Sequence, residues 1–316
     1  MRVLLWVVIM IKNILIVGAS GFIALNIIEE LLTNYNVNLT VYGRSRPKIN
    51  TCTLNFVHGE LIELPSKLKN SYSRKFTDVI YLVNNIPVNG NVDNYDILIN
   101  ENKNAIDYLS SISDRFVFFS SGGRVYKSSE KPHHEEDELY ATCIYGKSKI
   151  EIEEYVAKVA TESNIDHLII RPSNPYGRYQ NVYSTQGLIA VTLGKIMTGR
   201  DIEVWGAGSE IRDYIFIKDF IKAFLSLLMK PSLPYKVFNI GSGHGTSTLD
   251  IIHTILNSTS DLDVIIKKVD INRAIIPSNI LSIQRLEYTI GQQKMTSLSD
   301  GIKEFISYLQ QNVKRH

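Results

Sequence analysis

The chain of 316 residues has only two cysteines, Cys52 and Cys143, and they lie far apart without the spacing of metal ligands. Two isolated cysteines are typical of free thiols in a reduced, cytoplasmic protein. An excess of charge of one sign is also lacking, because 34 Lys and Arg residues are balanced by 32 Asp and Glu. No nucleic-acid partner is therefore predicted, and a small molecule is the expected one.

Long hydrophobic runs are missing as well. The most apolar stretch, residues 3–11, follows Arg2 and resembles part of a signal peptide, but it is far shorter than the roughly 20 residues that span a bilayer. It has no small-residue cleavage site and continues into another apolar run. We expect a cytoplasmic protein without membrane insertion, and the sequence leaves open whether Met1 or Met10 is the true start.

Short apolar runs alternate with stretches of helical spacing from residue 12 to residue 172. Such runs are typical of strands buried on both faces of a parallel sheet. The alternation predicts an α/β fold, a Rossmann-type doubly wound parallel sheet that forms an NAD(P)-binding domain. The expected strands are residues 14–17, 39–42, 79–83, 116–119 and 167–170, and the expected helices are residues 25–34, 100–112 and 145–163.

Residues 173–316 show a less regular pattern, with turn-rich stretches at 173–177 and 206–209 between short apolar segments. This pattern predicts a smaller C-terminal substrate-binding domain. A strand expected at residues 237–240 would return to the main sheet, so that the segments near 204–240 interleave the two domains.

A glycine-containing turn at residues 18–24, GASGFIA, separates the first expected strand from the first expected helix. Its backbone N–H groups and the helix N-terminus can hold a pyrophosphate. Ala24 replaces the third glycine of the usual spacing and adds only one methyl group. The residues predicted to bind the cofactor in this turn are Gly18, Ser20, Gly21, Phe22 and Ile23.

No carboxylate ends the second strand, where an acidic side chain normally binds the adenosine ribose. The sequence has Arg44 and Arg46 there, and a guanidinium can pair with the 2′-phosphate of NADP, although both arginines also fit solvated loop positions. The cofactor is therefore expected to be NAD(P), with tolerance of NADP. Glu60 and Leu61 are predicted near the adenine, although a solvent-facing Glu60 fits nearly as well.

Tyr145 and Lys149 lie four residues apart at the start of an expected helix, which places them on one face. The Lys149 charge would lower the phenol pKa and bind the nicotinamide ribose, while Tyr145 passes a proton to or from a sugar oxygen during hydride transfer. Such a pair also arises by chance on surface helices. Its place after the expected strand at residues 116–119 favours a catalytic role.

These motifs occur in one order along the chain, and together they resemble the extended short-chain dehydrogenases/reductases of the NAD-dependent epimerase/dehydratase family. The resemblance covers nearly everything after Lys12. It is carried by the turn at Gly18, residues 120–126 (SSGGRVY), the Tyr145 and Lys149 pair, and residues 171–177, 204–215 and 238–243.

The resemblance implies a nucleotide-sugar substrate and a homodimer. Asn174 and Arg212 would hold the diphosphate, which needs charge-assisted donors, and Arg273 resembles a third contact. The segment near Val204 would flank the nucleotide base, and Asn100 would belong to the cofactor site. A surface ion pair of Arg212 with the aspartate after it is the alternative for that arginine.

The chain departs from the family at Gly122, where Ser or Thr usually hydrogen-bonds the reacting sugar oxygen. Ser121 is the nearest substitute, and a water molecule or Tyr126 are alternatives. A second stretch, residues 133–138 (HHEEDE), contains metal-ligand side chains, but it is expected to be a solvated loop and no metal is predicted.

Two enzymatic functions fit these residues. One is an NAD(P)H-dependent reductase of a nucleotide-activated 4-keto-6-deoxyhexose such as dTDP-4-dehydro-6-deoxyglucose, which would serve O-antigen and lipopolysaccharide biosynthesis. The other is an NAD-dependent hexose 4-epimerase. A dehydratase is less favoured because Gly123 and Arg124 replace the acidic pair of that class. A non-catalytic dinucleotide-binding protein is disfavoured by the intact Tyr145 and Lys149.

Overall fold

The computed structural model describes residues 11–49, 54–69, 75–88, 93–259, 264–270 and 277–313. The strands are β1 (Lys12–Val17), β2 (Val37–Gly43), β3 (Asn55–His58), β4 (Phe76–Tyr81), β5 (Ser113–Phe119), β6 (Asp166–Pro172), β7 (Asn174–Tyr176), β8 (Ile202–Trp205), β9 (Ile211–Phe216), β10 (Val237–Ile240), β11 (Gly245–Ser247), β12 (Ile266–Val269) and β13 (Ser278–Asn279). The helices are α1 (Phe22–Asn34), α2 (Leu64–Lys69), α3 (Tyr95–Ser111), α4 (Ile144–Glu162), α5 (Leu188–Met197), α6 (Ile217–Leu228), α7 (Thr248–Ser258), α8 (Gln284–Ile290) and α9 (Leu298–Val313), with a short 3₁₀ turn, Leu61–Glu63, before α2.

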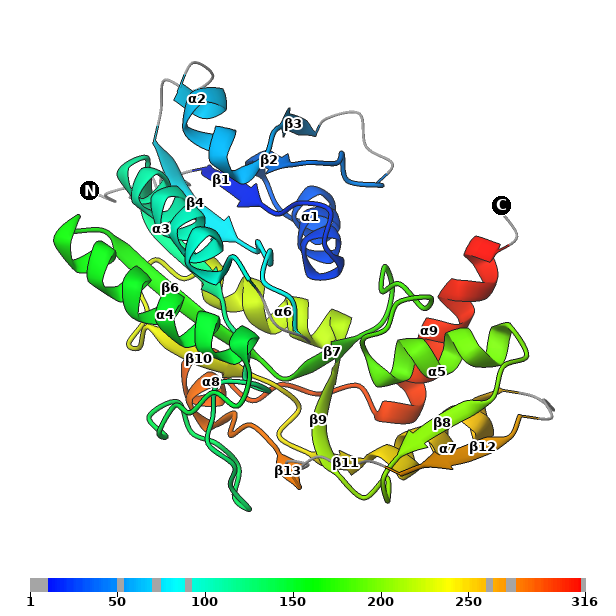
Figure 1. Cartoon of the computed structure of the whole chain (residues 1–316). Helices are drawn as coiled ribbons and strands as arrows, with labels where there is room; N and C mark the ends of the chain where they lie inside the picture. The colour runs from blue at the N-terminus through cyan, green and yellow to red at the C-terminus, as the bar shows by residue number, and fades with distance from the viewer. Residues whose placement is uncertain are drawn as a thin grey trace, which may run out of the picture.

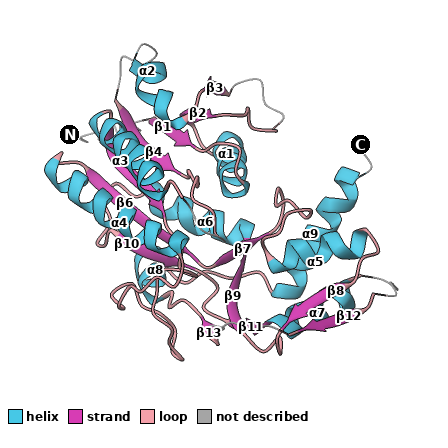
Figure 2. Cartoon of the chain, viewed as in Figure 1, coloured by secondary structure: helices cyan, strands magenta, loops and turns pink. Residues whose placement is uncertain are grey.

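The larger lobe is built on a seven-stranded sheet in the order β10-β6-β5-β4-β1-β2-β3. Every neighbouring pair in this sheet is parallel. The predicted doubly wound α/β fold is therefore confirmed. β10 pairs with β6, so a late segment of the chain completes the edge of the main sheet (Figure 2).

The sheet is buried on both faces, and successive residues of β1 show how. Leu15 and Val17 belong to the apolar cluster under α3 and α4, whereas Ile14 and Ile16 belong to the cluster under α1 and α6. Successive strand residues point to opposite faces, so an uninterrupted apolar run is what a doubly covered strand requires. Figure 1 shows α3 and α4 on one side of the sheet and α1 and α6 on the other.

The smaller lobe contains helices as well as short strands, although the sequence pattern after residue 172 is less regular than that before it. β9 pairs with β7, β11 and β13, β8 pairs with β12, and α5, α7 and α9 pack around these strands (Figure 1). α6 also follows residue 172, and its buried residues recur at helical spacing, a signal present in the sequence. None of the helices in the described ranges combines the length and apolarity needed to cross a membrane.

Phe224 packs α6 against the main sheet. Its side chain is fully buried, and its ring centroid lies 4.9 Å from that of Phe119 at the end of β5. We expect Phe224→Ala to lower the free energy of unfolding by about 3–5 kcal/mol, measured by urea denaturation, because it leaves a cavity. Tyr288→Ala, at a 77% exposed position, should change it by no more than about 0.5 kcal/mol. Equal midpoints for the two variants would contradict this assignment of the core.

Candidate functional site

The turn between β1 and α1 brings the backbone close to the neighbouring strand. Gly18 adopts φ +92°, and a Cβ atom at this position would lie 2.9 Å from the carbonyl carbon of Leu82. Only glycine fits such a place without displacing the backbone. Gly21 is the N-cap of α1 and has no side chain to cap the helix, which leaves the first-turn N–H groups available to an anion.

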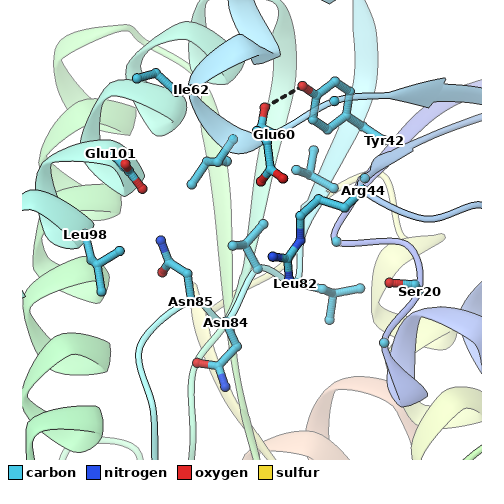
Figure 3. Close-up of a pocket in the computed structure, with 17 residues that line it drawn as sticks. Ser20, Tyr42, Arg44, Glu60, Ile62, Leu82, Asn84, Asn85, Leu98 and Glu101 are labelled. Carbon is cyan, nitrogen blue, oxygen red and sulfur yellow. Dashed lines mark hydrogen bonds between the residues drawn. The ribbon is translucent and has the colours of Figure 1, made fainter. Parts of the chain in front are cut away.

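A cleft of about 770 Å³ opens in front of this turn, at the carboxyl ends of β1, β2, β3 and β4 (Figure 3). Ligands of open parallel sheets bind at this edge because the loops that follow the strands meet there. The predicted residues that line the cleft are Gly18, Ser20, Gly21, Arg44, Glu60 and Leu61, and the lining residues that the sequence analysis missed include Leu82, Val83, Asn84, Asn85 and Glu101.

Other predicted cofactor residues lie elsewhere. Phe22 and Ile23 form the first positions of α1 and pack, partly buried, against the core. Asn100 is exposed on α3 and is not among the residues that line the cleft, whereas Glu101, the next residue, is. The signal for residues 82–85 was present in the sequence, because they continue directly from an expected strand to the edge where a cofactor binds.

The two arginines after β2 lie in different surroundings. Arg44 lines the cleft, and Figure 3 shows its side chain extending into it. Arg46 instead places its guanidinium 6.0 Å from the ring centroid of Phe56. At the same end of the cleft the Tyr42 hydroxyl donates a 2.7 Å hydrogen bond to the carbonyl oxygen of Glu60. Of the two predicted phosphate ligands, Arg44 is the one positioned at the cleft.

Tyr145 and Lys149 lie on successive turns of α4, as their spacing predicts. The Lys149 ammonium is buried and donates a 3.0 Å hydrogen bond to the carbonyl oxygen of Phe119, at the end of β5. Its Nζ atom lies 5.5 Å from the ring centroid of Tyr145. The ammonium is thereby fixed beside the phenol and at the carboxyl edge of the sheet.

Burial shifts the two groups in opposite directions. It raises the pKa of Tyr145 to about 12, although a hydrogen bond with Ser121 and the positive charge of Arg124 act against this shift. Burial lowers the pKa of Lys149 to about 8, and the negative charge of Glu153 opposes that shift. At neutral pH Tyr145 therefore carries its proton and Lys149 is mostly charged, the state in which the phenol can act as an acid.

The structure shows why glycine stands at position 122. A Cβ atom there would lie 2.5 Å from Cδ1 of Leu281 and 3.0 Å from the carbonyl oxygen of Pro172. The backbone is held on both sides, because the Gly122 N–H donates to Pro172 at 2.8 Å and the Asn279 amide donates to the Gly122 carbonyl at 3.3 Å. A serine or threonine would force Leu281 to move, and the hydroxyl that bonds Tyr145 comes from Ser121.

The stretch at residues 133–138 is only in part the solvated loop that was expected, because His134, Glu136 and Glu138 are exposed. His133 and Glu135 are buried, and the His133 ring stacks on Tyr126 with centroids 4.8 Å apart. Glu135 accepts a 2.9 Å hydrogen bond from the backbone N–H of Asn239, whose side chain accepts one of 2.6 Å from the Tyr126 hydroxyl. Tyr126 is thus committed to a buried network. Within the described ranges, no three His, Cys, Asp or Glu side chains form a metal-binding group.

Asn174 and Arg212 lie on paired strands, β7 and β9. The Asn174 amide donates a 2.7 Å hydrogen bond to the carbonyl oxygen of Asp213, and a guanidinium N–H of Arg212 donates one of 2.7 Å to Ile211. The Asp213 carboxylate is fully buried and accepts hydrogen bonds of 2.8 Å from the backbone and side chain of Ser242. It therefore faces the interior, unlike the carboxylate of a surface ion pair.

The remaining substrate-side predictions have mixed outcomes. Val204 is buried on β8, and Arg273 lies outside the described residues.

Arg124 connects the two halves of the site, because its positive charge acts on both Tyr145 and Arg212. Tyr145 on α4 and Arg212 on β9 are therefore both close enough to Arg124 to be affected by its charge.

The contact between Gly122 and Leu281 can be tested by adding a side chain. We expect Gly122→Ser to lower the free energy of unfolding by about 1–3 kcal/mol in urea denaturation, because the new atoms overpack against Leu281. Gly123→Ser is the matched control, since a Cβ atom there meets nothing within 4 Å. Adding Leu281→Ala to Gly122→Ser should reduce the strain, and a Gly122→Ser variant as stable as the control would disprove the steric explanation.

Comparison with known proteins places this geometry in a family. The model of the NAD dependent epimerase/dehydratase family matches residues 14–241. dTDP-4-dehydro-6-deoxyglucose reductase of Escherichia coli is 29% identical over 93% of this chain and 96% of its own length. UDP-glucose 4-epimerase of Mycolicibacterium smegmatis is 27% identical over 77% of this chain and 80% of its own length. The solved structure of UDP-glucose 4-epimerase of Thermotoga maritima with UDP-glucose has the same fold, with a TM-score of 0.84 at 23% identity over 95% of this chain and 99% of that one. The chain belongs to the NAD-dependent epimerase/dehydratase family and is an extended short-chain dehydrogenase/reductase enzyme with NAD as its cofactor.

Proposed function

We propose that this enzyme is an NAD(P)H-dependent reductase of a nucleotide-activated 4-keto-6-deoxyhexose, such as dTDP-4-dehydro-6-deoxyglucose, and reduces it at C4. The observation that carries the proposal is the buried, protonated Tyr145, which bonds Ser121 and has the Lys149 ammonium one helical turn away. This is the arrangement of a proton donor for a carbonyl oxygen. The Escherichia coli relative is named for this reaction.

The cleft fits the cofactor. Gly18 and Gly21 line it without a side chain, and the uncapped N-terminus of α1 would face a bound pyrophosphate. Gly18, Ser20 and Gly21 would hold the phosphates, and Arg44 and Glu60 would hold the adenosine end. Bound NAD(P)H would supply the hydride for C4 of the sugar.

Three side chains would carry the proton chemistry. Tyr145 would give its phenolic proton to the C4 oxygen, which together with the hydride from NAD(P)H would make the ketone a secondary alcohol. Ser121 hydrogen-bonds the same oxygen. The Lys149 ammonium stabilises the phenolate until solvent returns the proton, and it also binds the nicotinamide ribose.

The substrate lobe would hold the nucleotide diphosphate. Asn174 and Arg212 donate hydrogen bonds to it, with Arg273 as a third donor, and the segment at Val204 flanks the base. Gly123 and Arg124 stand where the family's dehydratases use an acidic pair, which supports reduction over dehydration. The product would enter a surface polysaccharide such as O antigen, and the enzyme would act as a homodimer.

A hexose 4-epimerase is the second candidate, and the named Mycolicibacterium smegmatis relative favours it. The same Tyr145 and Lys149 would then act twice at C4, first as the sugar is oxidised and then as it is reduced on the other face. Such an enzyme keeps its NAD bound throughout. Arg44 in place of a ribose-binding carboxylate supports an exchangeable cofactor such as NADP(H) and hence the reductase.

Mass spectrometry of small molecules released from the denatured protein, followed by an absorbance assay with NADH or NADPH and dTDP-4-dehydro-6-deoxyglucose, tests the proposal. A reductase releases little NAD and oxidises the reduced cofactor with the ketosugar. Tyr145→Phe should lower kcat by about 10²–10⁴ because it removes the proton donor, and it should still bind NADH. Stoichiometric NAD without net oxidation would instead identify the epimerase, and unchanged turnover of Tyr145→Phe would overturn the mechanism.

Arg44 and Arg46 form a matched pair for testing the choice of cofactor. Because only Arg44 lines the cleft, Arg44→Ala should raise the KM for NADPH by about tenfold, the loss of one charge-assisted hydrogen bond, and leave the KM for NADH nearly unchanged. Arg46→Ala should leave both values as they are. A parallel rise of both KM values in Arg44→Ala would contradict a phosphate-binding role.

A further inference from the structure

A buried ion pair lies directly behind the catalytic face of α4. Arg171, at the end of β6, donates to the Glu153 carboxylate from Nε at 3.1 and 3.2 Å and from Nη2 at 2.5 Å. Both side chains are 5% exposed. A bidentate pair with this geometry is the arrangement in which a buried carboxylate keeps its charge.

Glu153 is also one helical turn from Lys149, and its charge acts on that ammonium. The two side chains share one face of α4, where residues four apart are neighbours. The carboxylate therefore has two cations within reach, Arg171 from β6 and Lys149 from its own helix. The hydrogen bond of Lys149 goes to the Phe119 carbonyl, while Arg171 takes the carboxylate.

The other charged groups near α4 are directed elsewhere. Lys103 and Asp107 of α3 contact Glu151 and Tyr155, which α4 presents to α3. Arg124, in the loop after β5, acts on Tyr145. Among the described residues, Glu153 is the carboxylate whose charge acts on Lys149.

We propose that Arg171 is a positioning residue that occupies the Glu153 carboxylate and so leaves the Lys149 ammonium free for the Phe119 carbonyl and the nicotinamide ribose. Without Arg171, Glu153 would be a buried charge without compensation. Its nearest cation would then be Lys149, and an ion pair along α4 would draw the ammonium away from the cofactor.

The guanidinium is itself held from the substrate side of the fold. Its Nη1 atom donates to the Tyr126 hydroxyl at 2.9 Å and to the carbonyl oxygen of Glu135 at 3.0 Å. Tyr126 in turn donates to Asn239 on β10. This explains why Tyr126 and Glu135 are buried, since they fix the orientation in which Arg171 meets Glu153.

The dissociation constant of NADH, measured by titration calorimetry between pH 6 and pH 9.5, reports on Lys149 directly. Wild-type affinity should weaken by about tenfold from neutral pH to one unit above a pKa of about 8, because the charged fraction then falls to about a tenth. Arg171→Met should weaken NADH binding at pH 7 by about tenfold, because the Lys149 ammonium would lose one charge-assisted hydrogen bond to the cofactor. The decline of NADH affinity with pH should also move to higher pH, because Glu153 would then pair with that ammonium. Adding Glu153→Gln should restore affinity at pH 7 to within about threefold, because the competing carboxylate is gone.

Controls separate positioning from general loss of stability. Arg115→Met breaks another buried pair, which Arg115 of β5 forms with Asp78 of β4 at the amino ends of these strands, and should leave the pH dependence as in the wild type. Where Arg171→Met fails to fold, Glu153→Gln alone should move the decline to lower pH, since Glu153 raises the pKa of Lys149. A folded Arg171→Met with wild-type affinity, a double variant no better than the single one, or an unmoved decline in Glu153→Gln would each overturn the proposal.

The inference rests only on the cofactor part of the proposed function. NADH binding involves no sugar, so a protein that reduces no ketosugar would still show the predicted pH dependence. A failure of the reductase proposal and a failure of the positioning role are therefore distinguishable.

Discussion

The structure depends on one constraint, the parallel pairing of strands that are buried on both faces. Such strands have no room for polar side chains along most of their length, so the chemistry is confined to the loops and helix ends at their carboxyl edge. The loops after β1 to β4 line the cleft proposed to hold the cofactor, and the chain after β5 supplies Ser121. The end of β6 supplies Arg171, which faces α4. The order of the strands in the sheet therefore decides which residues can meet.

This constraint also explains how far the sequence could be read. Apolar runs identify the strands, and the residues after each run are then candidates for the site, which is how Gly18, Arg44 and Glu60 were found. The same logic extends to residues 82–85. It cannot resolve which face a helix turns to the cleft, since Asn100 and Glu101 are adjacent and only Glu101 lines it. The burial of His133 was equally hidden, because it depends on Tyr126 and on Asn239, more than a hundred residues away.

The departure at Gly122 is explained by its contacts with the C-terminal part of the chain. Leu281, from the C-terminal part of the chain, occupies the space that a Cβ atom at position 122 would need, and Asn279 donates a hydrogen bond to the carbonyl of the same glycine. The neighbouring Ser121 then makes the bond to Tyr145. The glycine that departs from the family pattern is thus explained by contacts with residues more than 150 positions further along the chain. Motif spacing alone does not contain that information, because it concerns packing between the lobes.

The electrostatics of α4 bear on the direction of the reaction. Burial raises the pKa of Tyr145 and lowers that of Lys149. The resting pair is therefore a neutral phenol beside an ammonium that loses its proton more easily than an exposed lysine does. This state is ready to give a proton to a carbonyl oxygen, as a reductase requires. An oxidation must begin with the loss of the same proton, against burial, and needs additional positive charge nearby. Arg124 supplies part of that charge. In the positioning role proposed for Arg171, Lys149 supplies more only while Arg171 binds Glu153. The buried pair behind α4 would then be an electrostatic condition of proton transfer at Tyr145 in either direction.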